Sequence, residues 1–197
     1  TPNMNFSTFV DETDVIVVSV EFRQGAFGWL QSKALKTGNK YTDSGNFAIL
    51  DIKLALEWVR DNIGFFGGDA GNVTLSGFSA GARDSLNAMI SPIMTGLFHK
   101  VVSFSGGMTT CSKQEGRKWT DEKLAKILVR RGRFSKKKRA LRYVKRMSAK
   151  KKKKLLYSLS DKEIKKMAGS SGLRLTNFPQ CFRDGTVIPK DGFDCLE

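Results

Sequence analysis

A serine flanked by glycines lies between a predicted strand and a predicted helix, and no other feature restricts the fold of this chain as strongly. Residues 72–76 (Asn-Val-Thr-Leu-Ser) have the pattern of a short strand, residues 77–81 spell Gly-Phe-Ser-Ala-Gly, and helical sequence follows to about Ile90. A G-x-S-x-G motif at a strand-to-helix turn presents a strained, exposed serine, because the small neighbours allow the tight turn. The alternative is an ordinary tight turn with an incidental serine. The context favours Ser79 as a nucleophile.

The elements around this turn predict an α/β fold. Residues 14–20 form a nearly continuous β-branched run, typical of a strand buried on both faces of a parallel sheet. A glycine-rich loop follows at 23–29, and apolar residues recur at helical spacing over 47–63. A third strand is predicted at 100–105. The order strand–helix–strand–helix–strand predicts a parallel sheet with helical crossovers.

The chain divides by charge into two regions. Residues 1–112 carry 8 Lys and Arg against 10 Asp and Glu, whereas residues 113–197 carry 26 against 9. We therefore expect a core that bears the serine over 1–112, a basic helical segment over 113–176, and a loop-rich segment over 177–197 with a turn at Asp184-Gly185. The basic segment predicts three or four short helices, whose expected N-caps are Thr120, Ser135, Ser148 and Ser160.

The basic segment itself has two interpretations. Residues 113–168 hold 23 Lys and Arg against 5 Asp and Glu, and such clustering can serve nucleic acid or another anionic surface. However, no interleaved aromatic residues suggest a stacking platform, and no nucleic-acid-binding motif is present. The pattern therefore favours a solvated helical face, with nucleic acid not expected as a partner.

Composition excludes several other classes. No stretch approaches the roughly 18 apolar residues of a membrane span, and the residues from Thr1 onward resemble neither a signal peptide nor a basic targeting arm. Cys111, Cys181 and Cys195 lack the spacing of metal ligands, so no metal, no cofactor and no disulfide framework are expected. The sequence assigns neither a compartment nor an oligomeric state.

His99, the only histidine, is a poor candidate for the base that a serine nucleophile needs. Ser79 follows the carboxyl end of its predicted strand, whereas His99 precedes the amino end of the next, parallel strand. About six residues at ~3.3 Å each place these two edges roughly 20 Å apart. A base has to approach its partner to ~3 Å or through one water. We expect His99 at the far edge of the sheet and Ser105 at the edge that carries Ser79.

Three stretches of the chain resemble the type-B carboxylesterase family. They are DVIVVSVEFRQGAFGWL, DSGNFAILDIKLALEWVRDNIGFFGGDAGNVTLSGFSAGA and GLFHKVVSFSGG, and FRDGTVIPKDGF resembles the D-G-x-x-x-P segment of the same family. The resemblance implies an α/β-hydrolase fold and a serine–acid–histidine triad that acts on carboxylic esters. It matches Ser79 to the nucleophile, the backbone N–H of Ala80 to an oxyanion donor, and Ser105 to a residue that supports the acid.

The departures from the family pattern also have consequences. The family's H-G-G-G-type loop, acid and base have no counterpart in the chain, which therefore resembles a central piece of a longer esterase. Position 78 is commonly glutamate in the family and is Phe78 here, so we expect neutral esters with aryl or short acyl groups rather than cationic ones. Two other functions remain open: a non-catalytic binding module on this fold, and a polyanion-binding protein that uses the basic helices.

Overall fold

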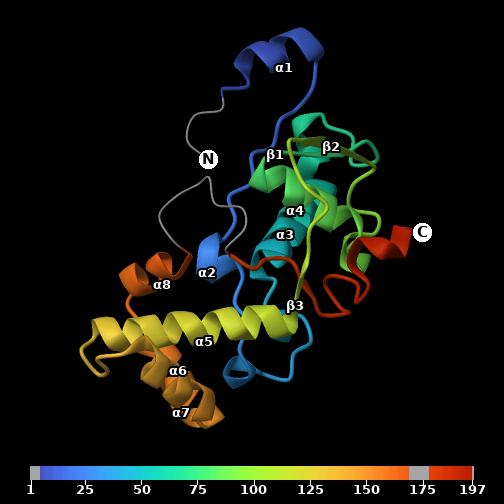
Figure 1. Cartoon of the computed structure of the whole chain (residues 1–197). Coiled ribbons are helices and arrows are strands. Elements are labelled where there is room, and N and C mark those ends of the chain that lie inside the picture. Colours follow the sequence, from blue (N-terminus) through green and yellow to red (C-terminus); the bar gives the residue numbers. More distant parts are fainter. Residues whose placement is uncertain (1–4, 169–177, 197) are drawn as a thin grey trace.

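The computed structural model describes residues 5–168 and 178–196, which form eight α-helices and two small parallel sheets within those ranges (Figure 1). The α-helices are α1 (Ser7–Thr13), α2 (Gly25–Gly28), α3 (Phe47–Asn62), α4 (Ala80–Met89), α5 (Lys113–Arg130), α6 (Lys137–Arg146), α7 (Ala149–Tyr157) and α8 (Asp161–Ala168). The strands are β1 (Thr74–Phe78), β2 (Lys100–Phe104), β3 (Cys111–Ser112) and β4 (Phe182–Arg183). Short 3₁₀ helices lie at Lys33–Leu35, Thr42–Ser44, Ile63–Phe66, Pro92–Met94 and Gly192–Leu196.

The centre of the fold is the unit β1–α4–β2, in which the two strands run parallel and α4 connects and contacts both. The strands are in register from Thr74 opposite Lys100 to Phe78 opposite Phe104. This confirms the parallel α/β arrangement that the order of elements predicts, including the helix at α3 and the strands at β1 and β2.

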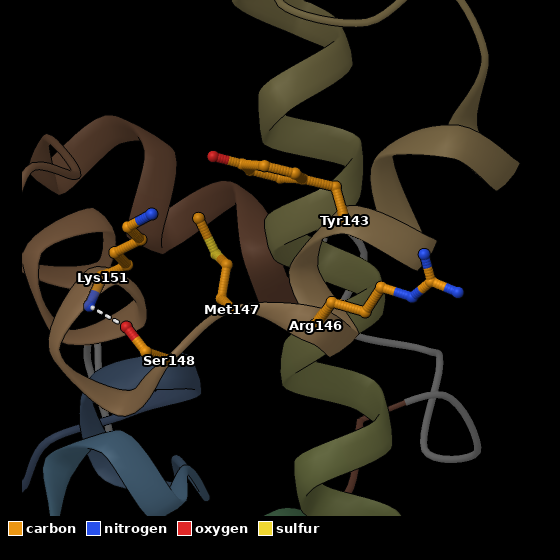
Figure 2. Close-up of a pocket in the computed structure, with 5 residues that line it drawn as sticks. All are labelled: Tyr143, Arg146, Met147, Ser148 and Lys151. Atoms are coloured by element: carbon orange, nitrogen blue, oxygen red, sulfur yellow. Dashed lines mark hydrogen bonds between the residues drawn. The ribbon is translucent and has the colours of Figure 1, made fainter.

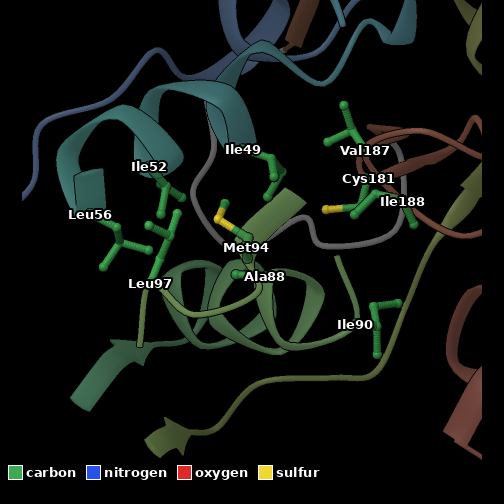
Figure 3. Close-up of a cluster of buried hydrophobic side chains, with 10 residues drawn as sticks. All are labelled: Ile49, Ile52, Leu56, Ala88, Ile90, Met94, Leu97, Cys181, Val187 and Ile188. Atoms are coloured by element: carbon green, nitrogen blue, oxygen red, sulfur yellow. The ribbon is translucent and has the colours of Figure 1, made fainter. Parts of the chain in front are cut away.

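Segments that are distant in the sequence meet in the core beneath this unit (Figure 3). The apolar face of α3 contributes Ile49, Ile52 and Leu56, because their spacing places them on one side of the helix. The opposite wall comes from α4 and the turn after it, and a third part comes from the carboxyl-terminal segment that contains Val187 and Ile188. The D-G-x-x-x-P segment is therefore packed against the core that supports β1 and α4.

The prediction of a strand over residues 14–20 is wrong. These residues belong to no strand, and none of the described residues pairs with them. Val15, Ile16 and Val18 are each more than a third exposed. An apolar run favours extended backbone, but it becomes a strand only where a neighbouring strand accepts its hydrogen bonds. Within the predicted loop at 23–29, residues Gly25–Gly28 form the single helical turn α2.

Helices α5 to α8 contain most of the Lys and Arg residues of the segment 113–168, and they lie apart from β1 and β2 (Figure 1). Two of the four expected caps are confirmed: the Ser148 hydroxyl accepts from Lys151 N at 3.3 Å, and Ser160 forms a capping box with Glu163. The other two are wrong. The helix α5 begins earlier, with a capping box between Ser112 and Glu115, so Thr120 is buried inside it.

The second wrong cap is Ser135, because the residue that precedes α6 is Lys136, which has no capping side-chain bond. The carboxyl-terminal segment, expected to be loop-like, contributes one short strand. Residues Phe182–Arg183 (β4) pair in parallel with Cys111–Ser112 (β3). A two-residue strand leaves no periodicity in a sequence, so only its partner reveals it. None of the helices in the described part of the chain is long and apolar enough to cross a membrane.

Candidate active site

Ser79 lies between the last residue of β1 and the first residue of α4, in a conformation that non-glycine residues rarely adopt. Its backbone angles are φ 55° and ψ −111°. Its N–H donates to the carbonyl oxygen of Phe104 at 2.8 Å, and its own carbonyl oxygen accepts from Arg83 N at 3.1 Å. The first bond continues the ladder between β1 and β2, and the second is the first hydrogen bond of α4. The sheet and the helix together hold Ser79 in a strained turn.

Close approach of the backbone explains one glycine of the motif but not the other. A Cβ at Gly77 would lie 2.3 Å from the backbone carbon and oxygen of Gly81. No side chain fits there, because the first turn of α4 folds back over the end of β1. A Cβ at Gly81 would meet nothing within 4 Å. The turn therefore requires glycine at 77, whereas position 81 has room for a methyl group.

A third glycine, Gly106, allows the segment after β2 to pack closely against α4. A Cβ at Gly106 would lie 2.6 Å from the Cβ of Ala82. Ser105, immediately before it, also has a positive φ of 56°. Since Phe78 is opposite Phe104 in the register, Ser105 follows β2 at the same edge at which Ser79 follows β1. The structure brings these two serines to one end of the sheet, as expected.

His99 lies at the other end. Its backbone N–H donates to the carbonyl oxygen of Val73 at 2.8 Å, and its ring Nδ1 accepts from Val73 N at 3.1 Å. Val73 precedes β1, whereas Ser79 follows it, so the whole strand separates the two side chains. His99 holds the start of the sheet and is not positioned to take a proton from Ser79.

The edge that carries Ser79 combines an apolar surface with backbone donors. Phe78 is 64% exposed and its register partner Phe104 is 56% exposed. Side chains directly opposite one another in a parallel pair lie on the same face of the sheet, so the two rings belong to one exposed apolar face. Ala80 is the first residue of α4. The first N–H groups of a helix have no intrahelical acceptor, and the helix dipole makes this end electropositive.

A buried polar cluster in α4, which sequence reasoning missed, lies shortly after the serine turn. Asp84 is 2% exposed, and its carboxylate is 3.5 Å from the Arg83 guanidinium. The Cys181 thiol donates to the same carboxylate at 3.9 Å. Burial raises the pKa of Asp84 to about 6, against the opposing effect of Arg83. The signal in the sequence was the pair Arg83-Asp84 within the apolar part of a predicted helix, where charged residues need partners.

Hydrogen bonds also fix the carboxyl-terminal segment to the core. Asn46, which is fully buried, donates to the carbonyl oxygen of Phe182 at 2.9 Å and accepts from Phe182 N at 2.7 Å. The Asp184 carboxylate accepts from the backbone N–H groups of the turn that follows it, Thr186, Val187 and Ile188. Asp184-Gly185 is therefore a turn, as predicted, and its carboxylate organises it. Cys181, buried with φ 52°, starts this segment.

The parallel sheet, the strained serine and the helix that starts directly after it define the α/β-hydrolase fold class. The family model described as "Carboxylesterase family" matches residues 1–197, and the chain belongs to this family.

Its relatives include human Carboxylesterase 3, which is 32% identical over 185 residues, or 93% of this chain and 28% of that protein. The para-nitrobenzyl esterase of Bacillus subtilis is 38% identical over 114 residues, or 58% of this chain and 22% of that protein. Among solved structures, the Geobacillus stearothermophilus carboxylesterase EST55 at pH 6.2 superposes with a TM-score of 0.71 at 27% identity. That superposition covers 93% of this chain and 34% of the other. The chain spans less than a third of the curated relatives it matches.

Proposed function

We propose that this chain carries the nucleophile of a serine carboxylester hydrolase, with Ser79 as that nucleophile. The observation that carries the proposal is the backbone of Ser79, held at φ 55° between β1 and α4. Strained backbone is concentrated at functional sites, so the strain at Ser79 supports a functional role for this residue. Membership of the carboxylesterase family supports an ester as the substrate.

In the proposed reaction the Ser79 hydroxyl oxygen attacks the ester carbonyl carbon while its proton passes to a base. The tetrahedral oxyanion accepts a hydrogen bond from the backbone N–H of Ala80. The intermediate then collapses, and the bond between the carbonyl carbon and the alcohol oxygen breaks. The alcohol leaves with the proton from the base, and the acyl group remains on Ser79 as an acyl-enzyme. Water then attacks the acyl carbon, releases the acid and restores the Ser79 hydroxyl.

The base and the acid of this reaction are not assigned to residues near Ser79. The distance along the sheet excludes His99, and His99 is the only histidine in the sequence. We therefore propose the activity for a catalytic domain in which the triad is complete. Ser105 is proposed to support the acid, since it lies at the same edge of the sheet as Ser79.

The proposed substrates are neutral esters with aryl or short acyl groups. Phe78 and Phe104 give the sheet edge beside Ser79 an exposed apolar face. An aryl ring can pack on these side chains, whereas a cationic group would find no carboxylate from position 78.

Two measurements test the nucleophile. Because Ser79 needs a base and an acid from a complete triad, the test uses a chimaera in which the aligned part of this chain replaces the corresponding segment of the Bacillus subtilis para-nitrobenzyl esterase. A fluorescent organophosphonate should label this chimaera at Ser79, as identified by peptide mass spectrometry, and Ser79→Ala should abolish the label while Ser76→Ala retains it. That chimaera should release a burst of p-nitrophenol from p-nitrophenyl acetate, and Ser79→Ala should remove the burst. A folded chimaera without burst or label would assign the chain to the non-catalytic binding class instead.

A further inference from the structure

The surface of α6 and of the first turn of α7 forms a shallow trough. One hollow, of about 380 Å³, is lined by Arg139, Arg142, Tyr143 and Arg146. A second, of about 250 Å³, is lined by Tyr143, Arg146, Met147, Ser148 and Lys151 (Figure 2). The two hollows share Tyr143 and Arg146, so they are adjoining parts of one depression. It lies in the helical region away from Ser79, and its use would be independent of ester hydrolysis (Figure 1).

The positive charge around this trough is largely unneutralised among the residues that the structure describes. Residues 123–160 contain 17 Lys and Arg and no Asp or Glu. Within residues 5–168 and 178–196, two of these cations have carboxylate partners, in the ion pairs Arg131–Glu163 and Lys152–Asp121. The side chains of Arg139, Arg142 and Arg146 have no hydrogen-bond or ion-pair partner among residues 5–168 and 178–196. Their guanidinium groups are exposed and remain available to an external anion.

The three arginines form a row rather than a scattered patch. Their spacing of three and four residues places them on one face of α6, over a length of about 10 Å at the helical rise of ~1.5 Å per residue. The opposite face carries Ala140 and Val144, both fully buried against the core. The packing of Ala140 and Val144 therefore fixes the position of the helix that carries the three arginines. Guanidinium groups bind phosphate through paired N–H donors, so a row of them suits an extended chain of phosphates.

Tyr143 adds an aromatic surface in the middle of this row. Tyr143 is 45% exposed and lines both hollows, and its ring packs against Phe134 with ring centroids 5.2 Å apart. The prediction that no aromatic residue is interleaved with these cations is wrong at one position, because Tyr143 directly follows Arg142. In α6, Tyr143 also lies within about one helical turn of Arg139 and Arg146. A nucleobase can stack on this ring, whereas inorganic polyphosphate has no group that could do so.

We propose that this trough binds single-stranded nucleic acid, with phosphates on Arg139, Arg142 and Arg146 and a base stacked on Tyr143. Positively charged grooves with exposed aromatic side chains are the common basis of sequence-tolerant single-strand binding. Such binding weakens steeply with salt, because each phosphate contact releases a counterion.

The test is fluorescence anisotropy of the full chain with a labelled oligothymidylate of about 20 nucleotides, at about 50 to 200 mM NaCl. The triple variant Arg139→Gln, Arg142→Gln, Arg146→Gln should bind at least about 30-fold more weakly at low salt and lower the log–log salt slope by roughly 2. The matched control is Lys162→Gln, Lys165→Gln, Lys166→Gln on α8, which removes the same charge outside the trough. The affinity of this control for the oligothymidylate should fall by no more than about three-fold.

Tyr143→Leu separates a nucleic acid from other polyanions. It should weaken oligothymidylate binding roughly ten-fold and leave the binding of inorganic polyphosphate unchanged. Far-UV circular dichroism checks that each variant remains folded. Equal losses in the two triple variants would overturn the trough as the binding site. Two results would overturn nucleic acid as the ligand of the trough. One is an equal loss of affinity for oligothymidylate and polyphosphate in Tyr143→Leu. The other is tighter binding of heparin or phosphatidylserine vesicles with the same dependence on the three arginines.

Discussion

The backbone N–H of Ser79 donates to the carbonyl oxygen of Phe104 at 2.8 Å, one residue beyond the end of β1. This bond continues the ladder of the sheet into the turn and holds the candidate nucleophile beside β2. The sheet and α4 are therefore joined at Ser79, whose backbone adopts a strained positive φ as a result. The strain, the glycines around it and the buried carboxylate in α4 each lead to a measurable consequence.

Replacing Ser79 by glycine should stabilise the fold relative to replacing it by alanine. Strain at a positive φ costs on the order of 1–3 kcal/mol for a residue with a Cβ, and glycine avoids it at an entropic cost of about 0.5–1 kcal/mol. We expect Ser79→Gly to exceed Ser79→Ala by about 1 kcal/mol in the free energy of unfolding, measured in urea. Equal stability of the two variants would mean that the turn is not strained.

The two glycines of the motif should differ sharply. Gly77→Ala places a methyl group 2.3 Å from the backbone of Gly81 and should lower the free energy of unfolding by about 3 kcal/mol or more. Gly81→Ala meets no neighbouring atom and lies inside α4, where alanine is favoured over glycine by up to about 1 kcal/mol. The second variant is the matched control, measured by the same urea titration. A Gly77→Ala protein as stable as the Gly81→Ala protein would contradict the close packing of β1 on α4.

Asp84 should make the chain less stable as the pH rises. Burial raises the pKa of Asp84 from 3.8 to about 6, so the folded state binds a proton that the unfolded state has already released between these values. Stability from this group is present below about pH 4 and is lost as the pH rises through about 6. Asp84→Asn removes the dependence, so between about pH 4 and pH 7 the stability of the variant relative to the parent should rise by about 2 kcal/mol. Parallel pH profiles of the two proteins would show that Asp84 ionises normally.

Glu163 should have the opposite effect. The Arg131 guanidinium and the Ser160 backbone hold the pKa of Glu163 at about 2, below its usual 4.5. The stability that Glu163 supplies is present above about pH 4.5 and is lost as the pH falls through about 2. Because the pair is partly exposed, Glu163→Gln should cost only about 1 kcal/mol at pH 7. The difference between parent and variant should shrink both at pH 3 and in high salt. A constant difference would assign it to the capping box, which Ser160→Ala tests separately.

Phe78 should control the preference between neutral and cationic esters. In the chimaera with the Bacillus subtilis esterase, Phe78→Glu should raise kcat/KM for acetylcholine about five-fold relative to its neutral isostere 3,3-dimethylbutyl acetate. The reason is that a carboxylate beside Ser79 attracts the quaternary ammonium. Phe78→Leu is the uncharged control and should leave that ratio unchanged. An unaltered ratio in Phe78→Glu would show that position 78 does not face the alcohol group.

Local sequence determined the elements that surround Ser79. The helical spacing of α3, the apolar pattern of β1 and β2, and the glycines at the turn depend on neighbours close in the chain, and all were predictable. The same holds for Ser148 and Ser160, whose capping bonds reach only three residues ahead. The place of His99 at the far edge of the sheet also followed from strand length and direction alone.

Only the tertiary structure decided the features that depend on distant partners. Residues 14–20 have the composition of a strand but form none, since none of the described strands pairs with them. Conversely, Phe182–Arg183 form a strand because Cys111–Ser112 lie beside them. Asp84 reaches its raised pKa because the fold buries its carboxylate, against the opposing effects of Arg83 and of the Cys181 thiol. The periodicity of a sequence indicates which local conformation a segment favours. Strand pairing and burial depend instead on which segments the fold brings together.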